Sequence, residues 1–251
     1  MWGSVPVYFG LTVALLGLAL VLRPVRRLRI TTRHRALLVT GVGILLVGVG
    51  LALPAPEQRI TRVETRLDEF VPLWQFHELH RIQIAAPPAR VYEALRRVRA
   101  DEIFLFRFLT WLRRGGRPLP AGILNPGTRQ PLLDVATSSG FVRLADSAPH
   151  ELVIGTVVMA PPGAQGTLTP QVFRRELPPG FVLAAMNFLV TADGAGGSRV
   201  ATETRVFANS AAARRSFAVY WRLIHPGSAL IRRMWLRAIR RRATASPRGS
   251  G

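Results

Sequence analysis

The chain has 251 residues, of which 49% are hydrophobic, and its mean hydropathy is positive at +0.22. It carries 34 basic residues, all of them arginine, against 14 acidic ones, so its formal net charge is +20, and it has no cysteine. The lack of cysteine excludes a disulfide framework, a thiolate zinc site and a cysteine nucleophile.

The positive mean hydropathy is unusual for a wholly soluble chain and indicates membrane segments. The arginine-only bias, beside abundant Ala, Gly and Pro, is more typical of genomic base composition than of a chemical role. The chain has no stacked aromatic–basic RNA motif, no zinc finger and no convincing helix-turn-helix. We therefore expect no nucleic-acid partner, and a basic surface in contact with solvent is the simpler interpretation.

Two apolar runs begin the chain. Residues 1–22 and residues 36–56 contain no charged side chain, and each run is close to the ~20 residues that a helix needs to cross a bilayer. We predict a transmembrane hairpin over residues 1–56, with spans of about 4–22 and 36–54. A cleaved signal peptide is an alternative for the first run, but no basic residue precedes Arg23.

Small residues recur within both runs. Gly10 and Ala14, and also Gly48 and Ala52, are spaced four apart, which would let the two helices pack closely. The alternative is that small residues are simply common in this chain.

The segment between the two runs, RPVRRLRITTRHR at 23–35, has six arginines in thirteen residues. By the positive-inside rule this short loop is cytoplasmic. Because Arg59, Arg62 and Arg66 follow the second run, the contrast is six against three. We predict an integral protein of a bacterial cell membrane, with everything after residue 56 on the extracytoplasmic side.

Residues 57–73 are charged and are interpreted as a linker, followed by one domain at 74–245 and a disordered tail at 246–251. Apolar and polar residues alternate from Trp74 to Ile84, which predicts a strand. Within this strand, FHELH is similar to a zinc-protease motif. However, the second histidine comes at i+3 instead of i+4, and alternate strand residues point to opposite faces. We therefore expect no metal at this motif.

The rest of the domain combines short helices with a meander of strands. A helix is expected at 89–98 and another from Asp101, which is placed as its N-cap, with loops at 115–127 and 160–170. A DGAGG turn at 193–197 joins the last two strands as a hairpin. The predicted strands are 140–145, 151–159, 171–177, 180–192 and 198–208.

The C-terminal region is helical and amphipathic. Phe217, Tyr220, Trp221 and Ile224 follow i, i+3, i+4, i+7 spacing. Pro226-Gly227 is expected to interrupt the helix, after which Ser228 caps a second stretch.

The domain resembles the START-like, or SRPBCC, superfamily of polyketide cyclase/dehydrase and lipid-transport proteins, as a membrane-anchored bacterial member. The similar stretches are IQIAAPPARVYEALRRV, GFVRLADSAPHELVIGTV, GGSRVATETRVFA and FAVYWRLIHPGSALIRRMWLRAIRRRA. The resemblance implies an α+β helix-grip domain, in which a curved antiparallel sheet surrounds a long C-terminal helix, with a deep hydrophobic cavity between the sheet and the helix. It implies binding of lipids, sterols, polyketides, hormones or quinones, and in a minority of members cyclisation, dehydration or hydrolysis.

Candidate site residues follow from strand parity. Glu78 and His80 share a face with Phe76, so they are candidates for a general base or for orienting a ligand; alternatively both are solvated at a domain edge. Glu203 and Arg205 point to the same face of their own strand and are predicted to form a structural ion pair, with each other or with an arginine of the last helix. The predicted cavity residues are Phe76, Glu78, His80, Phe141, Asn187, Phe188, Phe217, Tyr220 and Trp221.

The function predicted from these features is a membrane-anchored binding protein that holds a hydrophobic small molecule or a lipid, with membrane lipids as further partners. No catalytic residue, metal ligand or cofactor is assigned. Two alternatives stay open: an interaction protein with a filled cavity, and a cyclase or hydrolase that uses Glu78 and His80.

Overall fold

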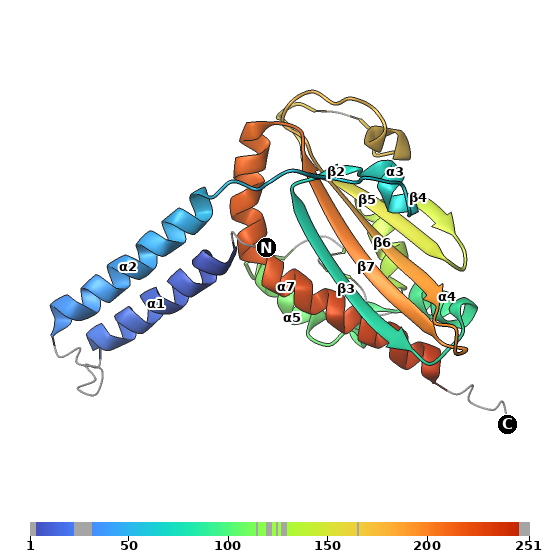
Figure 1. Ribbon diagram of the computed structural model, residues 1–251, viewed down its shortest axis with the longest axis horizontal. Coiled ribbons are helices and arrows are strands. Elements are labelled where there is room, and N and C mark those ends of the chain that lie inside the picture. The colour runs from blue at the N-terminus through green and yellow to red at the C-terminus, as the bar shows by residue number, and fades with distance from the viewer. Residues whose placement is uncertain are drawn as a thin grey trace. The chain divides into compact units, whose positions relative to one another are not determined.

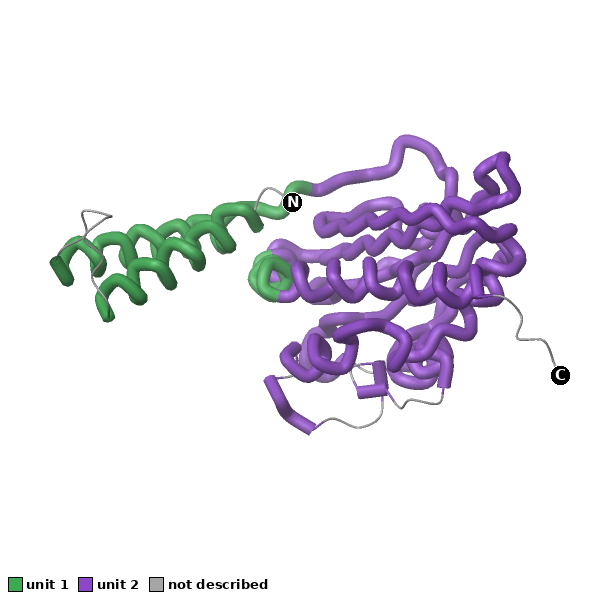
Figure 2. The backbone as a smooth tube through the Cα atoms, turned by 90° about the horizontal axis from the view of Figure 1, so that it is seen from below, with its two compact units in different colours: residues 1–56, 215–223 green, residues 57–214, 224–251 purple. Residues whose placement is uncertain are grey.

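The computed structural model describes residues 4–22, 32–113, 115–118, 122–123, 125–126, 130–164 and 166–245. The chain divides into two compact units (Figure 2). The first unit comprises residues 1–56 with 215–223, and the second comprises residues 57–214 with 224–251.

The first unit contains helices α1 (Ser4–Leu22) and α2 (Arg33–Ala52) (Figure 1). Both are long and apolar enough to cross a membrane, with mean hydropathies of 2.3 and 2.1. The predicted pair of apolar helices is confirmed, although α2 begins at Arg33 because Thr32 serves as its N-cap and accepts a hydrogen bond from Arg35 N. Most of the arginine-rich loop, residues 23–31, lies outside the described residues.

Glycines form the contact between these two helices. Gly10 and Gly17 of α1 and Gly43 and Gly50 of α2 are buried, in each helix seven residues apart. The large apolar side chains face outward instead, including Phe9, Leu15, Leu16, Leu22, Leu38, Ile44 and Leu45, each more than half exposed. Small residues inside and large apolar residues outside suit helices whose surroundings are hydrocarbon.

The predicted role of Gly48 in this contact is wrong. A Cβ added at Gly48 meets no described atom within 4 Å, whereas one at Gly43 falls 2.3 Å from the backbone nitrogen of Ala14.

We expect Gly43→Leu to separate the helices and to lower the stability of the helix pair by about 1–3 kcal/mol or more. Amide hydrogen exchange of α1 and α2 in detergent should then become faster, and Gly48→Leu is the matched control. Equal exchange in both variants would contradict this packing.

Helix α7 (Ala211–Thr244) continues through Pro226, so the predicted interruption is wrong. Proline has no N–H, which leaves the carbonyl of Arg222 without its helical donor, and the hydroxyl of Tyr8 donates to that carbonyl. The buried Arg222 guanidinium donates to the carbonyls of Leu51 at 2.8 Å and Leu53 at 2.5 Å, and burial lowers its pKa. Arg222 thus donates hydrogen bonds to carbonyls at the end of α2 that have no donor within the helix.

The second unit is built on a five-stranded antiparallel sheet in the order β3-β7-β6-β5-β4, with the α7 residues from 224 onward on one side, as in the helix-grip arrangement (Figure 1). The predicted β6–β7 hairpin is present, and Asp193 closes its turn by accepting hydrogen bonds from the amides of Ala195 and Gly197. The strands are β3 (Phe76–Ile84), β4 (Val142–Ser147), β5 (Glu151–Met159), β6 (Val182–Ala192) and β7 (Ser198–Ala208).

Short helices complete this unit, and some differ from expectation. Asp101 lies within a 3-10 turn, and the carboxylate of Glu102 takes over the capping by accepting from Arg99 N at 3.0 Å. The predicted strand 171–177 is wrong: Pro170 begins a 3-10 turn there, since its fixed φ suits a first helical position. The helices are α4 (Pro88–Arg97), η2 (Ala100–Glu102), α5 (Phe106–Arg113), α6 (Leu132–Ser138), which was not predicted, and η3 (Pro170–Phe173).

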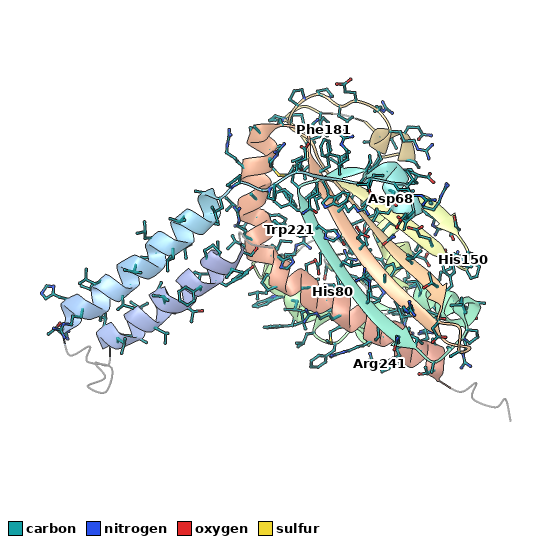
Figure 3. All side chains as sticks on the ribbon, viewed as in Figure 1. Asp68, His80, His150, Phe181, Trp221 and Arg241 are labelled. Carbon is teal, nitrogen blue, oxygen red and sulfur yellow. The ribbon has the colours of Figure 1, made fainter. Side chains whose placement is uncertain are left out.

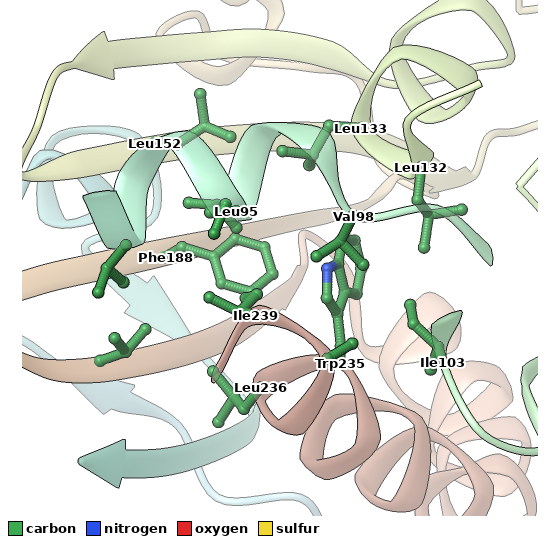
Figure 4. Packing of buried hydrophobic residues seen from close by; sticks show 14 of the residues in the cluster. Leu95, Val98, Ile103, Leu132, Leu133, Leu152, Phe188, Trp235, Leu236 and Ile239 are labelled. Carbon is green, nitrogen blue, oxygen red and sulfur yellow. The ribbon is translucent and has the colours of Figure 1, made fainter. Parts of the chain in front are cut away.

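The two faces of the sheet are covered by different elements. The inner face packs against α7 and α4 in a large apolar cluster that includes Leu95, Phe188, Trp235 and Ile239 (Figure 4). The outer face is covered by residues 57–74, which contain β1 (Gln58–Arg59), α3 (Arg66–Phe70) and β2 (Leu73–Trp74). This segment was expected to be a linker, but its Leu67 and Phe70 are buried against the sheet.

Candidate functional site

A carboxylate is buried on the inner face at the edge strand β3. Glu78 is 5% exposed, and its two oxygens have different partners. Oε1 lies 2.6 Å from Nε2 of His80, and Oε2 accepts a hydrogen bond from the Ser228 hydroxyl of α7 at 3.0 Å. Of the two sequence interpretations, a solvated pair does not fit Glu78, because strand and helix enclose it. Figure 3 marks His80 beside α7.

The two histidines of the FHELH motif lie on opposite faces of the sheet. His77 points to the outer face, where its Nε2 lies 3.0 Å from Glu203 Oε1, while His80 points to the inner face. No group of three or more metal-ligating side chains occurs among the residues that the structure describes.

Three polar atoms between the sheet's inner face and α7 are buried and have no hydrogen-bond partner within the described part of the chain. They are the hydroxyl oxygen of Thr202, Nη1 of Arg232 and the indole nitrogen of Trp235. Native interiors leave few polar groups unpaired, so three in one region require an explanation.

These three groups belong to one neighbourhood. Thr202 stands on β7 directly opposite His80 of β3 and opposite Phe188 of β6. The ring centroids of Phe188 and Trp235 are 5.0 Å apart, in an edge-to-face arrangement. The central guanidinium carbon of Arg232 lies 5.9 Å from the Trp235 ring centroid. Figure 4 shows Phe188 and Trp235 side by side within the apolar cluster. The unpaired donors therefore lie between the sheet and α7, where the Glu78 carboxylate acts electrostatically on Arg232.

This neighbourhood is electrostatically unusual. Burial lowers the pKa of the Arg232 guanidinium to about 10, with Glu78 opposing the shift and Arg113 adding to it. Burial also lowers the pKa of His225, again against the attraction of Glu78. Because Arg232 forms no ion pair with a described residue, its charge is incompletely compensated inside the protein.

The arrangement suits binding better than nucleophilic catalysis. In a catalytic triad the base lies between the nucleophile and the carboxylate. Here the Glu78 carboxylate lies between Ser228 and His80, so the serine hydroxyl meets a carboxylate where a triad would place an imidazole. The free donors on Arg232 and Trp235 instead offer hydrogen bonds to an acceptor oxygen.

The other predicted cavity residues fall in three places. Phe76 and Phe188 are buried on the inner face, and Phe141 is partly buried against the same cluster. Asn187 faces outward, because neighbouring strand residues alternate; it donates to Glu151 at 2.6 Å and accepts from Glu203 N at 3.1 Å. The aromatic residues Phe217, Tyr220 and Trp221 belong to the first unit, where the Phe217 ring contacts the other two.

The outer face carries a cavity of about 410 Å³ over a buried ionic network. Arg205 donates to Glu203 and to Asp68, each at 2.6 Å, and its guanidinium lies 4.1 Å from the Trp74 ring centre. Burial raises the pKa of Asp68 and of Glu203, but hydrogen bonds to each carboxylate and the Arg205 charge outweigh it, so both pKa values are lowered. Strand alternation correctly predicted that Glu203 and Arg205 lie on one face of the sheet. The participation of Asp68, which is far away in the sequence, was not predicted.

Comparison with known proteins adds no family assignment. No protein-family model matches the chain, and no curated protein matches it. Among solved structures, Ms6760 from Mycobacterium smegmatis is 16% identical with a TM-score of 0.32, covering 76% of this chain and 99% of that one. TTHA0849 from Thermus thermophilus is 11% identical with a TM-score of 0.27, covering 67% and 97%.

A third similar structure is CalU16 from Micromonospora echinospora, 16% identical with a TM-score of 0.25, covering 66% of this chain and 83% of that one. Identities and TM-scores at this level carry no argument about family or function. The helix-grip architecture stated above therefore stands on this chain's own strands and helices.

Proposed function

We propose that this protein is a membrane-anchored binding protein that holds a hydrophobic molecule between its sheet and α7. The observation that carries the proposal is the set of three buried, unpartnered polar atoms on Thr202, Arg232 and Trp235. An apolar interior with a few convergent polar groups is the usual composition of a small-molecule site.

The donors define the chemical class of the ligand. Arg232 and the Trp235 indole can only donate, so the ligand needs an acceptor oxygen, as in a carboxylate or a carbonyl. The residues packed around these polar atoms are apolar, so the remainder of the ligand is hydrocarbon, whose removal from water contributes roughly 25 cal/mol per Å². A fatty acid and a quinone both meet this description.

The apolar helices supply the anchor in this proposal. Their outward-facing large side chains suit a lipid environment, and the arginine-rich segment 23–35 favours a cytoplasmic loop. The ligand-binding unit then lies on the extracytoplasmic side of the membrane. Labelling of a cysteine introduced at exposed Arg199 with a membrane-impermeant reagent on intact cells tests this orientation.

Native mass spectrometry of the full chain, released from detergent, tests the binding proposal. A stoichiometric apolar molecule with an acceptor oxygen is the expected result, identified after solvent extraction. A chain that is empty and refuses added fatty acids and quinones would leave the three polar atoms to buried water and would favour an interaction protein.

Conservative substitutions give the second test. We expect Trp235→Phe to lower the affinity for the ligand about 5- to 13-fold, because one hydrogen bond to the ligand contributes roughly 1–1.5 kcal/mol. The empty protein should keep or gain stability, since the substitution removes a donor that has no partner among the described residues. Arg232→Met should act in the same direction, and Arg233→Met, at an exposed position, is its control. Unchanged occupancy in both site variants would contradict the proposal.

A further inference from the structure

The second unit exposes its large apolar side chains almost entirely in one place. Over the ranges that the structure describes, six such residues in this unit are exposed, and five of them lie between residues 104 and 112. The five are Phe104, Leu105, Phe108, Trp111 and Leu112, at 65%, 39%, 55%, 47% and 58% exposure. Scattered exposed apolar residues are normal, but a contiguous patch marks an interaction surface.

This patch, residues 104–112, is the outward side of α5 and the turn before it. The inward side is fixed, because Phe106 and Thr110 are buried and Phe106 belongs to the inner apolar cluster. On the outward side, the Phe108 and Trp111 rings stack with centroids 6.3 Å apart. Leu105 precedes the helix with a φ of +59°, a conformation that leucine rarely adopts. The fold therefore holds these rings at the surface.

We propose that this patch inserts into the headgroup region of the bilayer that anchors the chain. The inference rests on the membrane anchoring in the proposed function and adds a second contact with the same membrane. Tryptophan, phenylalanine and leucine beside arginine are the composition of interfacial helices, which lie roughly 5–10 Å deep in the boundary between headgroups and acyl chains.

Charge favours a lipid surface over a protein partner. Arg107 is exposed on the patch and forms no ion pair with a described residue, and the net charge of the chain is +20. An anionic headgroup layer complements this charge, whereas a second copy of the chain brings the same positive charge to the contact. The apolar helices of the same chain also keep the lipid surface within reach.

The consequence for binding is an entry route. Helix α5 has one side in the inner cluster and the other exposed, and Arg113 at its end acts electrostatically on Arg232 of the candidate site. A hydrophobic ligand leaving the bilayer beside α5 would not have to cross water.

The natural lack of cysteine makes the test direct. Phe108→Cys and Leu112→Cys are labelled with a nitroxide in the full chain, reconstituted in vesicles of phosphatidylcholine and phosphatidylglycerol. Leu16→Cys on the outward side of α1 is the lipid reference, and Arg199→Cys on β7 is the solvent reference. Accessibility to oxygen and to a water-soluble nickel complex is then measured by electron paramagnetic resonance.

We expect labels at 108 and 112 to show oxygen-to-nickel accessibility ratios severalfold above that of Arg199→Cys and approaching that of Leu16→Cys. Ratios equal to the solvent reference, with Leu16→Cys still in lipid, would overturn the insertion but leave the anchor intact. Exclusion of both reagents from 108 and 112 would indicate a protein contact and also overturn it. A water-exposed Leu16→Cys would instead refute the anchoring on which the inference rests.

Discussion

Replacing Arg205 by methionine is expected to lower the free energy of unfolding of the second unit by about 3–5 kcal/mol. The Arg205 side chain is 7% exposed, and its partner Asp68 is 5% exposed, so solvent screens this pair little. Methionine would leave the buried carboxylate of Asp68 without its counter-ion and that of Glu203 with His77 alone. Chemical denaturation followed by tryptophan fluorescence measures the change.

The control for Arg205→Met is Arg199→Met, on the same strand but exposed. It removes the same charge and should change the unfolding free energy by less than about 0.5 kcal/mol. If the two variants lose equal stability, net charge and not the buried network would be the cause.

The same network predicts a loss of stability in acid. The pKa values of Asp68 and Glu203 are lowered from 3.8 and 4.5, so the folded state holds these protons less tightly than the unfolded state. The stabilisation is therefore fully present above those unfolded values and is lost as the pH falls through the lower folded values. Asp68→Asn should flatten this acid limb.

Replacing Glu151 by alanine is expected to cost about 2–4 kcal/mol, because it leaves several donors without an acceptor. Glu151 is 3% exposed and accepts from Arg66 N at 2.7 Å, Leu67 N at 3.3 Å and the Asn187 side chain at 2.6 Å. The first two donors are at the start of α3, so the carboxylate attaches residues 57–74 to the sheet.

The readout specific to this attachment is amide exchange in α3 and β2, which should accelerate more than exchange in β6. Glu151→Gln keeps one acceptor oxygen and about the same volume, and it should lose roughly half as much stability. Uniform acceleration over the whole sheet would show that Glu151 supports the core in general and not this attachment.

Strand alternation explains why much of the sheet was predictable. Period-two patterns depend on which face is buried, and they identified β5 and β7 with their observed bounds and placed Glu78 with His80. The same rule, applied strictly, would have placed Asn187 and Phe188 on opposite faces of the sheet instead of grouping the two in one cavity.

The unpaired donors on α7 could not be predicted from strand parity, because they depend on which helix turn meets the sheet. A signal was nevertheless present: Ser228, Arg232 and Trp235 follow i, i+4, i+7 spacing, so they line one side of the helix. The Pro226 prediction failed because a freed carbonyl needs only some other donor, and Tyr8 supplies it.

The seven-residue spacing of the glycines in α1 and α2 also determines how those helices wind. Seven residues fall short of the ~7.2 that complete two turns, so a straight helix would let the glycine seam drift by roughly 20° per repeat. Contact at both Gly10 and Gly17, and at both Gly43 and Gly50, therefore calls for a left-handed supercoil. One residue inserted between Gly43 and Gly50 would rotate the second glycine about 100° away and bring Val49 to its place, where even a Cβ would fall 2.7 Å from the Val7 side chain.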